Sequence, residues 1–224
     1  MSVCKQCGES KSNLGNHWRL SSDCDYPKLN SKQSSVLTGI LIGDGTLDRS
    51  GANCRVKIEM INEEYLQYVD DILGNLSNGV TKVQSAEESA ERMRDSGFRP
   101  NANSDDYSSV YRLTTKRHPK FNDFESWYSG DGKVIPEIEL TPTILKHWYV
   151  CDGHLIQNSG HRPRVSIGIT NEYEFSDKLE QMFIEQGIDA NATKSKNLNI
   201  GADHTEKFFE FIGESVDGFK YKWP

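Results

Sequence analysis

The sequence predicts an α+β protein made of two copies of one αββαββα unit, preceded by a short segment rich in cysteine and histidine. Three observations predict this architecture. A pattern of apolar residues ending in Asp-Gly occurs twice, at an offset of 108 residues (36 to 144). Each occurrence is followed by the same succession of strand-like runs and amphipathic helices. In addition, three of the five cysteines lie within the first 30 residues.

The composition is that of a folded protein with an acidic balance. The 224 residues are 35% hydrophobic, and the 18 glycines raise the apolar share to about 43%, which disfavours a disordered chain. The length favours one to two domains. No apolar run approaches the ~20 residues of a membrane helix, and the first ten residues lack a signal-peptide core, so we expect a soluble, cytoplasmic protein. The net charge of −7 argues against a uniformly basic nucleic-acid binder, but not against one with its positive charge on one face.

Residues 1–30 are predicted to bind a structural metal ion. Two residues separate Cys4 from Cys7, and His17 and Cys24 follow after nine and six more residues. Thiolate and imidazole ligands at such short spacing suit tetrahedral Zn²⁺. The segment has too little apolar content to bury a core unaided, so the metal would supply its folding energy. A disulfide pair or ordinary reduced thiols are the alternatives, and an intracellular setting disfavours the disulfide.

The internal repeat defines the domain organisation. It consists of VLTGILIGDGTL at 36–47 and ILKHWYVCDGHL at 144–155. After a one-residue insertion the match continues at an offset of 109, where Arg55 pairs with Arg164. The predicted domains are the segment 1–30, a first half at 31–130, a linker at 131–142 and a second half at 143–224.

Each half is predicted to contain the same elements in the same order. Apolar residues at i, i+1, i+4 and i+5 form one helical stripe, which ends at Asp-Gly because glycine tolerates the left-handed geometry of a helix end. In the first half, the predicted elements are a helix ending at Asp44, strands at 46–50, 54–61, 80–85 and 109–115, and helices at 62–76 and 119–128, with 86–107 as an inserted loop. In the second half, they are a helix from Thr141 to Asp152, strands at 154–158, 163–170, 189–195 and 198–202, and helices at 171–187 and 204–213.

Basic residues gather on the predicted strands, and acidic residues gather on the helices behind them. The strand regions 49–58, 107–122, 154–171 and 190–202 together carry a charge of +11 and no acidic side chain, whereas the helices at 62–75 and 172–189 carry −4 and −5. Such a separation allows an acidic protein to bind phosphates with strongly salt-dependent affinity. The alternative is that these charges are merely solvated faces. The candidate phosphate-contacting residues are Arg49, Arg55, Lys57, Arg112, Lys116, Arg117, Arg162, Arg164, Lys194 and Lys196.

Asp44 and Asp152 form the predicted chemical centre. Each ends the apolar helix of its half, so both carboxylates meet if the two helices pack side by side, with Gly39 permitting close backbone approach. Two clustered carboxylates raise each other's pKa unless a cation joins them, and Mg²⁺ prefers such oxygen ligands. A divalent ion there could activate water and stabilise the leaving oxygen of a phosphodiester. The alternative is that each residue only ends a helix, since Asp-Gly is a common turn dipeptide.

The two helix motifs, LTGILIGDG at 37–45 and LKHWYVCDG at 145–153, resemble the signature helices of the LAGLIDADG homing endonucleases. The stretches TTKRHPKFNDFESWY at 114–128, GKVIPEIELTP at 132–142 and FKYKWP at 219–224 are also similar to members of that family. The resemblance implies a monomeric, pseudo-symmetric enzyme whose two four-stranded sheets form a saddle on DNA. It further implies cleavage of both strands at a long, specific double-stranded site.

The resemblance also implies roles for individual residues. It makes Asp44 and Asp152 the catalytic acids that bind Mg²⁺, with the main-chain carbonyls of Gly43 and Cys151 as further metal ligands. Lys116, at the end of the last strand of the first half, is the implied basic residue that polarises the active-site water or phosphate. The second half has no matching lysine, so the site should be asymmetric.

The second helix departs from the family pattern. Lys146 and His147 stand where small or apolar residues are usual, and Cys151 stands where an acid or alanine is frequent. Because His147 replaces a close-contact glycine, either the helix crossing widens locally or His147 points outward. Neither change removes a catalytic acid.

The leading interpretation is a site-specific, Mg²⁺-dependent DNA endonuclease. The second is a non-catalytic nucleic-acid binder on the same scaffold, either an intron RNA maturase or a DNA-binding regulator, and the retention of both acids favours the nuclease. The endonuclease part of an intein is disfavoured because no splicing-domain sequence flanks the two halves. The zinc segment lies outside the resemblance and either contacts the DNA backbone or is purely structural. Polar strand residues suited to base contacts are Thr114, Ser166, Thr193 and Asn197.

Overall fold

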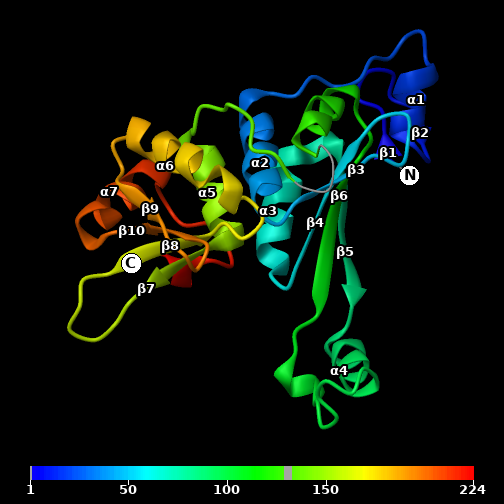
Figure 1. The fold of residues 1–224 in the computed structure, drawn as a ribbon. Coiled ribbons are helices and arrows are strands. Elements are labelled where there is room, and N and C mark those ends of the chain that lie inside the picture. The colour runs from blue at the N-terminus through cyan, green and yellow to red at the C-terminus, as the bar shows by residue number, and fades with distance from the viewer. Residues whose placement is uncertain (1, 129–132) are drawn as a thin grey trace. The chain divides into compact units, whose positions relative to one another are not determined.

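The computed structural model describes residues 2–128 and 133–224 (Figure 1). Contacts divide the chain into two compact units: unit 1 comprises residues 1–30 and 46–123, and unit 2 comprises residues 31–45 and 124–224. The predicted boundary between the first half and the linker, at 130–131, lies outside the described residues. Within the described ranges, no helix combines the length and the apolar character needed to cross a membrane.

Unit 1 is built around an antiparallel sheet with the strand order β3-β4-β6-β5. Its strands are β3 (Thr46–Asp48), β4 (Arg55–Met60), β5 (Ser77–Gln84) and β6 (Val110–Thr115). Helix α3 (Glu63–Leu73) packs against β5 and β6. Along β4, Val56 and Ile58 are buried, while the alternating charged residues Arg55, Lys57 and Glu59 remain accessible. Since successive side chains of a strand point to opposite faces, one face of this sheet is apolar and the other is charged.

The polar stretch between β5 and β6 forms a helical insertion and not the predicted loop. It contains α4 (Ala86–Asp95) and lies at the far end of the β5–β6 pair (Figure 1). Ser85 and Glu88 form a capping box, in which each side chain accepts a hydrogen bond from the backbone N–H of the other residue. Of its ten residues, all of them described, α4 buries Ala90 alone. Without an apolar stripe the helix gives no periodic signal in the sequence, and its cap and end charges stabilise it instead.

The first half closes with the 3₁₀ helix Pro119–Trp127, where the sequence predicts an α-helix. Phe121, Phe124 and Trp127 recur at every third residue. That spacing matches the three residues per turn of a 3₁₀ helix and places the three rings on one side. An α-helix of 3.6 residues per turn would rotate them progressively away from each other.

Unit 2 contains the apolar helices of both halves and the second sheet. The helices are α2 (Ser31–Ile42), α5 (Pro142–Asp152), α6 (Ser176–Glu185) and α7 (Ala202–Ile212). The strands are β7 (Gly153–Ile156), β8 (Arg164–Gly168), β9 (Ala190–Ala192) and β10 (Asn197–Ile200). Their antiparallel order, β7-β8-β10-β9, is the equivalent of the order in unit 1, which confirms the predicted repeat and the α+β class.

The core of unit 2 is aromatic. Trp148 and Tyr149 of α5 are fully buried, and Trp148 packs against Phe183 of α6 at 5.9 Å between ring centroids. Tyr149 makes edge-to-face contacts with Phe208 and Phe209 of α7 at 5.1 and 5.8 Å. Such aromatic pairs add to the burial term and fix α5 firmly in the unit.

The N-terminal segment is a small module docked on unit 1. It consists of β1 (Ser2–Val3), β2 (Ser10–Lys11) and α1 (Leu14–Leu20). Its own core is limited to Cys4, Leu14, Trp18 and Cys24, with Tyr26 packed against it. So small a core cannot stabilise a module by burial alone.

Candidate functional site

Helices α2 and α5 pack along a seam formed by glycines. A Cβ atom on Gly39 would overlap the carbonyl oxygen of Ile144 and lie 2.8 Å from the Cβ of His147. A Cβ atom on Gly43 would likewise overlap the Cβ of Cys151. The predicted close approach at Gly39 is therefore confirmed, and only glycine fits at either position without a shift of the helices.

His147 lies inside this seam. Its side chain is 1% exposed, so the alternative in which it points outward is wrong. Its Cβ atom lies against Gly39, in the space that a side chain at that position would need. Burial, with the charges of Lys146 and Lys32 nearby, lowers the pKa of His147 to about 3, which keeps the ring neutral at physiological pH.

The two acidic residues lie together at the same end of the helix pair. Asp152 is the last residue of α5, and Asp44 follows α2 by two residues. The Oδ2 atom of Asp152 would lie 3.1 Å from a Cβ on Gly43, which places this carboxylate against the end of α2. Burial, together with the negative charges of Asp44 and Glu172, raises the pKa of Asp152 to about 7. The raised pKa shows that nearby cations do not fully balance the negative charge of Asp44 and Asp152.

Lys133 contacts the end of α2. Its Nζ donates hydrogen bonds to the carbonyl oxygens of Ile42 and Gly43, the latter at 3.2 Å, and pairs with Oε1 of Glu172 at 2.9 Å. The Lys133 and Glu172 side chains are 11% and 5% exposed, so this is a buried ion pair. An ammonium group at the C-terminal end of a helix complements the negative end of the helix dipole.

Lys222 makes the corresponding contact at α5. Its Nζ donates to the carbonyl oxygen of Val150 at 2.7 Å, and Val150 occupies the repeat position equivalent to Ile42. Burial lowers the pKa of Lys222, whereas the negative charges of Asp152 and Asp44 raise it. Each signature helix therefore ends on a lysine ammonium group supplied by a distant part of the chain.

Lys133, Lys222 and Glu172 could not be singled out from the sequence. The stretches GKVIPEIELTP and FKYKWP that contain the two lysines were quoted for their similarity to the family, but neither lysine was given a role. Glu172 was counted only as a helix charge. No local pattern indicates that these three side chains reach the acidic pair, since the contacts form only when the chain folds.

Lys116, the basic residue implied by the resemblance, lies in unit 1. Its Nζ donates a hydrogen bond to the carbonyl oxygen of Ser77, and half-burial of the side chain lowers its pKa. Its role as the residue that polarises water or phosphate stays a prediction. The side chain of Cys151 packs against Gly43 in the helix seam, where burial raises the pKa of the thiol.

Ion pairs engage many of the candidate phosphate-contacting cations. Asp48 pairs with three of them at once, and hydrogen bonds from Ser50 and these cations hold the pKa of Asp48 well below its usual range. Asp48 and Glu59 border the strand segments that were counted as free of acid. The pairs are Asp48 with Arg55, Lys57 and Arg117, Glu59 with Arg112, and Asp203 with Arg162. The positive charge of the unit 1 sheet is therefore smaller than the sequence count suggests.

A row of polar side chains crosses the sheet of unit 2. His154 of β7 is paired with Ser166 of β8, Ser166 with Asn199 of β10, and Asn199 with Asn191 of β9. Their neighbours along the strands, such as Val165 and the residues flanking Asn199, are buried toward the helices. The row therefore occupies the face away from α6 and α7, and we call it the polar row.

The Cys/His cluster is assembled as predicted. The ligand atoms of Cys4, Cys7, His17 and Cys24 all lie within 4.8 Å of one another. The sulfur atoms of Cys4 and Cys24 are 3.8 Å apart, which is too far for a disulfide and is about the spacing of two ligands around tetrahedral zinc. A hydrogen bond from the Cys7 backbone lowers the pKa of Cys4 to about 6, and burial raises that of Cys24 to about 11.

Two equivalent four-stranded sheets, and two tightly packed helices with a carboxylate at or just after the end of each, define the class of LAGLIDADG proteins. The model of the LAGLIDADG DNA endonuclease family matches residues 34–209. This chain belongs to that family, and the resemblance stated from the motifs is confirmed. No curated protein sequence matches the chain.

Solved structures show the same fold at low sequence identity. The homing endonuclease I-WcaI bound to its DNA recognition sequence is 15% identical, with a TM-score of 0.70 over 95% of this chain and 98% of that chain. The N-terminal LAGLIDADG domain of DUF199/WhiA is 11% identical, with a TM-score of 0.50 over 98% of this chain and 97% of that chain.

Proposed function

We propose that this protein is a site-specific endonuclease that hydrolyses phosphodiester bonds in both strands of double-stranded DNA. The observation that carries the proposal is the pair of carboxylates, Asp44 and Asp152, at the ends of two tightly packed helices. Family membership supports it, as does the similarity to I-WcaI, whose structure contains a DNA recognition sequence. Because one chain supplies both carboxylates, the protein would act as a monomer.

The acidic pair fits a hard divalent cation such as Mg²⁺. Carboxylate oxygens are the ligands that Mg²⁺ prefers, and the carbonyl oxygens of Gly43 and Cys151 are candidate additional ligands. Because Gly43 already accepts one hydrogen bond from Lys133, a second lone pair would serve the metal. A bound Mg²⁺ supplies activation of water and stabilisation of the leaving oxygen in phosphodiester hydrolysis.

Lys133 and Lys222 would prepare the site for a phosphate. Their ammonium groups hold the last carbonyl groups of α2 and α5 in place, so the two carboxylates keep a fixed separation. Their positive charge also offsets the accumulation of negative charge when a DNA backbone approaches the acidic pair. We also propose that Lys116 takes part in the reaction as a basic group.

The strands would provide specificity. The exposed members of the polar row of unit 2, which are His154, Asn191 and Asn199, offer hydrogen-bond donors and acceptors suited to base edges. Ser166 is only 3% exposed, so the prediction that it contacts bases is not kept. On the unit 1 sheet, the cations held by Asp48 and Glu59 suit phosphates that position the duplex. Further phosphate contacts would come from exposed cations, which are Arg49, Arg164, Lys194 and Lys196.

We further propose that Cys4, Cys7, His17 and Cys24 hold one structural zinc ion. All four side chains are good zinc ligands, and their spacing fits closed tetrahedral coordination. The metal would supply the folding energy that the small core of residues 1–30 lacks.

The proposed activity is tested by incubating the protein with a pool of randomised duplexes, with Mg²⁺ and separately with Ca²⁺. We expect strand scission with Mg²⁺ and binding without scission with Ca²⁺. Asp44→Asn and Asp152→Asn should abolish scission while retaining binding, because each removes a metal ligand. Asp177→Asn, which neutralises an exposed carboxylate on α6, is the matched control and should cleave normally. Tight binding without scission under any divalent ion would instead favour the non-catalytic binder.

A further inference from the structure

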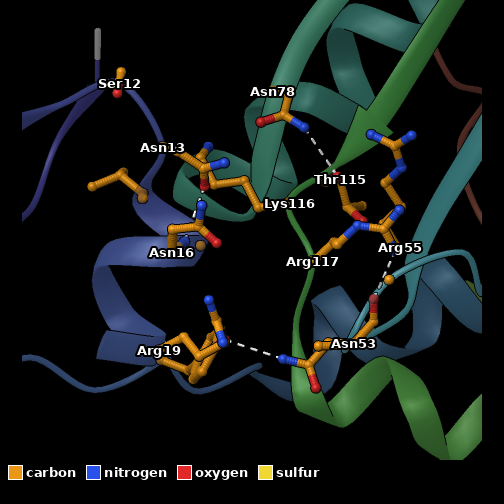
Figure 2. A pocket seen from close by; sticks show the side chains of 15 residues that line it. Ser12, Asn13, Asn16, Arg19, Asn53, Arg55, Asn78, Thr115, Lys116 and Arg117 are labelled. Atoms are coloured by element: carbon orange, nitrogen blue, oxygen red, sulfur yellow. Dashed lines mark hydrogen bonds between the residues drawn. The ribbon is translucent and has the colours of Figure 1, made fainter. Parts of the chain in front are cut away.

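A polar cavity lies in unit 1, where the N-terminal segment meets the end of the sheet (Figure 2). It has a volume of about 460 Å³, the size of pockets that hold small molecules rather than single ions. One wall is formed by α1 and the turn before it, with Asn13, Asn16 and Arg19. The other wall is formed by the β3–β4 connection and the end of β6, with Asn53 and Lys116 among its residues.

The two walls are held together by specific contacts. His118, which is 3% exposed, donates a hydrogen bond from Nε2 to the carbonyl oxygen of Pro27 at 2.8 Å. The amide of Asn53 donates to the hydroxyl group of Tyr26 at 3.1 Å, and the Tyr26 ring packs edge-on against His118 at 5.1 Å. The N-terminal segment is thus fixed to the sheet, and the cavity is a built feature of unit 1.

The charge of the cavity is positive. Its lining contains Arg19, Arg55, Lys116 and Arg117 and no acidic residue. Asp48, just behind the wall, pairs with Arg55 and Arg117 and offsets part of their charge. Arg19 is different, because its guanidinium group is exposed and pairs with no carboxylate within residues 2–128 and 133–224. Lys116 is half-buried, with a backbone carbonyl as its partner.

Arg55 links the cavity to the DNA-binding face proposed above. Its side chain belongs to the charged face of β4 and also lines the cavity. A DNA backbone that follows this face beyond the end of the strands would therefore reach the cavity wall that contains Arg19. The amides of Asn13, Asn16, Asn53 and Asn78 add hydrogen-bonding groups that suit phosphate and sugar oxygens.

We propose that this cavity binds a sugar–phosphate segment of the DNA duplex beyond the stretch contacted by the strands, with Arg19 as its principal unpaired cation. The inference rests on the proposed DNA-binding function and assigns the N-terminal segment a part in it. The segment extends the duplex contact at one end and is not only a structural appendage. A free anion such as inorganic phosphate shares the chemistry, and the experiment separates the two sources.

The test uses a duplex selected from randomised DNA by the wild-type protein in Ca²⁺, where no scission interferes. Arg19→Gln is compared with Lys5→Gln, a variant of the same segment that removes an equal charge outside the cavity. Arg19→Gln should weaken binding about tenfold, as for one charge-assisted hydrogen bond, and reduce the salt slope by about 0.9. Phosphate-ethylation interference should disappear at one end of the site only. Arg19 is exposed, so thermal unfolding should be unchanged.

Several results would overturn the inference. Identical footprints and salt slopes for Arg19→Gln and Lys5→Gln would show that the cavity makes no duplex contact. Loss of inorganic phosphate binding in Arg19→Gln with an unchanged DNA footprint would assign the cavity to a free anion. Failure of the nuclease proposal gives a different result, because scission with Mg²⁺ would then be absent while the Arg19-dependent footprint in Ca²⁺ remained.

Discussion

At the scale of single residues, Asp152 links proton binding to stability. Burial and the charges of Asp44 and Glu172 raise the pKa of Asp152 to about 7, against about 3.9 in an unfolded chain. Between these values the folded state binds more protons than the unfolded state, so stability falls as pH rises. The contribution is complete below about pH 4 and is lost by about pH 7.

The metal-free protein should therefore become less stable between about pH 4 and 7, by up to about 4 kcal/mol relative to Asp152→Asn. Denaturant unfolding in the presence of a chelator, measured across this pH range for both proteins, checks the expectation. Magnesium should remove the difference, because it stabilises the ionised pair. Parallel pH profiles for the two proteins would contradict the assigned pKa.

The buried ion pair between Lys133 and Glu172 also contributes to stability at the level of single residues. Lys133→Met leaves the Glu172 carboxylate buried without its partner, so we expect a loss of about 3–5 kcal/mol in unfolding free energy. The double variant Lys133→Met with Glu172→Gln should regain most of this stability, since no unpaired charge remains. Strand scission should stay impaired in both, because neither restores an ammonium group at the end of α2. Recovery of scission in the double variant would limit Lys133 to a structural role.

At the scale of elements, the seam between α2 and α5 sets the geometry of the acidic pair. Gly39 and Gly43 let the helix backbones approach until side-chain and carbonyl atoms of α5 fill the space of a missing methyl group. The aromatic contacts of Trp148 and Tyr149 prevent α5 from moving away. The seam is therefore intolerant of added volume.

Gly39→Ala should destabilise the protein by about 1–3 kcal/mol, the usual effect of overpacking, and should strongly reduce scission by separating the carboxylates. Gly201→Ala is the matched control, because a Cβ atom at Gly201 meets no atom within 4 Å and its φ of −64° is accessible to alanine. Chemical denaturation and a cleavage assay on both variants measure the two effects. Equal behaviour of the two variants would show that α2 and α5 can separate freely.

At the scale of the whole molecule, the duplication could be predicted because local sequence patterns occur in both halves. The apolar stripes, the Asp-Gly helix ends and the strand-like runs each leave a periodic signal, and the structure has matching helices and strands in both halves. Helix α4 leaves no such signal because it buries so little apolar surface. The Cys/His cluster could also be predicted from the sequence, since its four candidate ligands lie within one short stretch.

What the sequence could not predict depends on contacts between distant segments. Lys133 and Lys222 reach the ends of α2 and α5 from outside the repeated motifs, and no spacing rule connects them. Counting charges by strand also overestimated the free positive charge, because Asp48 stands one residue before the counted segment and pairs with three cations. Charge balance is a property of the folded surface and not of a sequence window.

Loss of zinc should affect the structure of unit 1 beyond the metal site, since the N-terminal segment forms one wall of its cavity. Chelation should release about one zinc ion per chain and expose Trp18, which belongs to the same small core as Cys4 and Cys24. Metal analysis and tryptophan fluorescence check this. Cys24→Ser should lose the ion, whereas Cys54→Ser, a buried thiol outside the cluster, should retain it. A zinc-free protein with unchanged Trp18 fluorescence would contradict the assignment.

The contact between Gly39 and His147 limits which halves can be combined in one chain. These residues occupy equivalent repeat positions, so one half contributes a bare backbone where the other contributes a side chain. A chain assembled from two first halves would have unfilled space at this contact, and one assembled from two second halves would bring two β-carbons too close together. The two halves have thus diverged at this contact into complementary shapes.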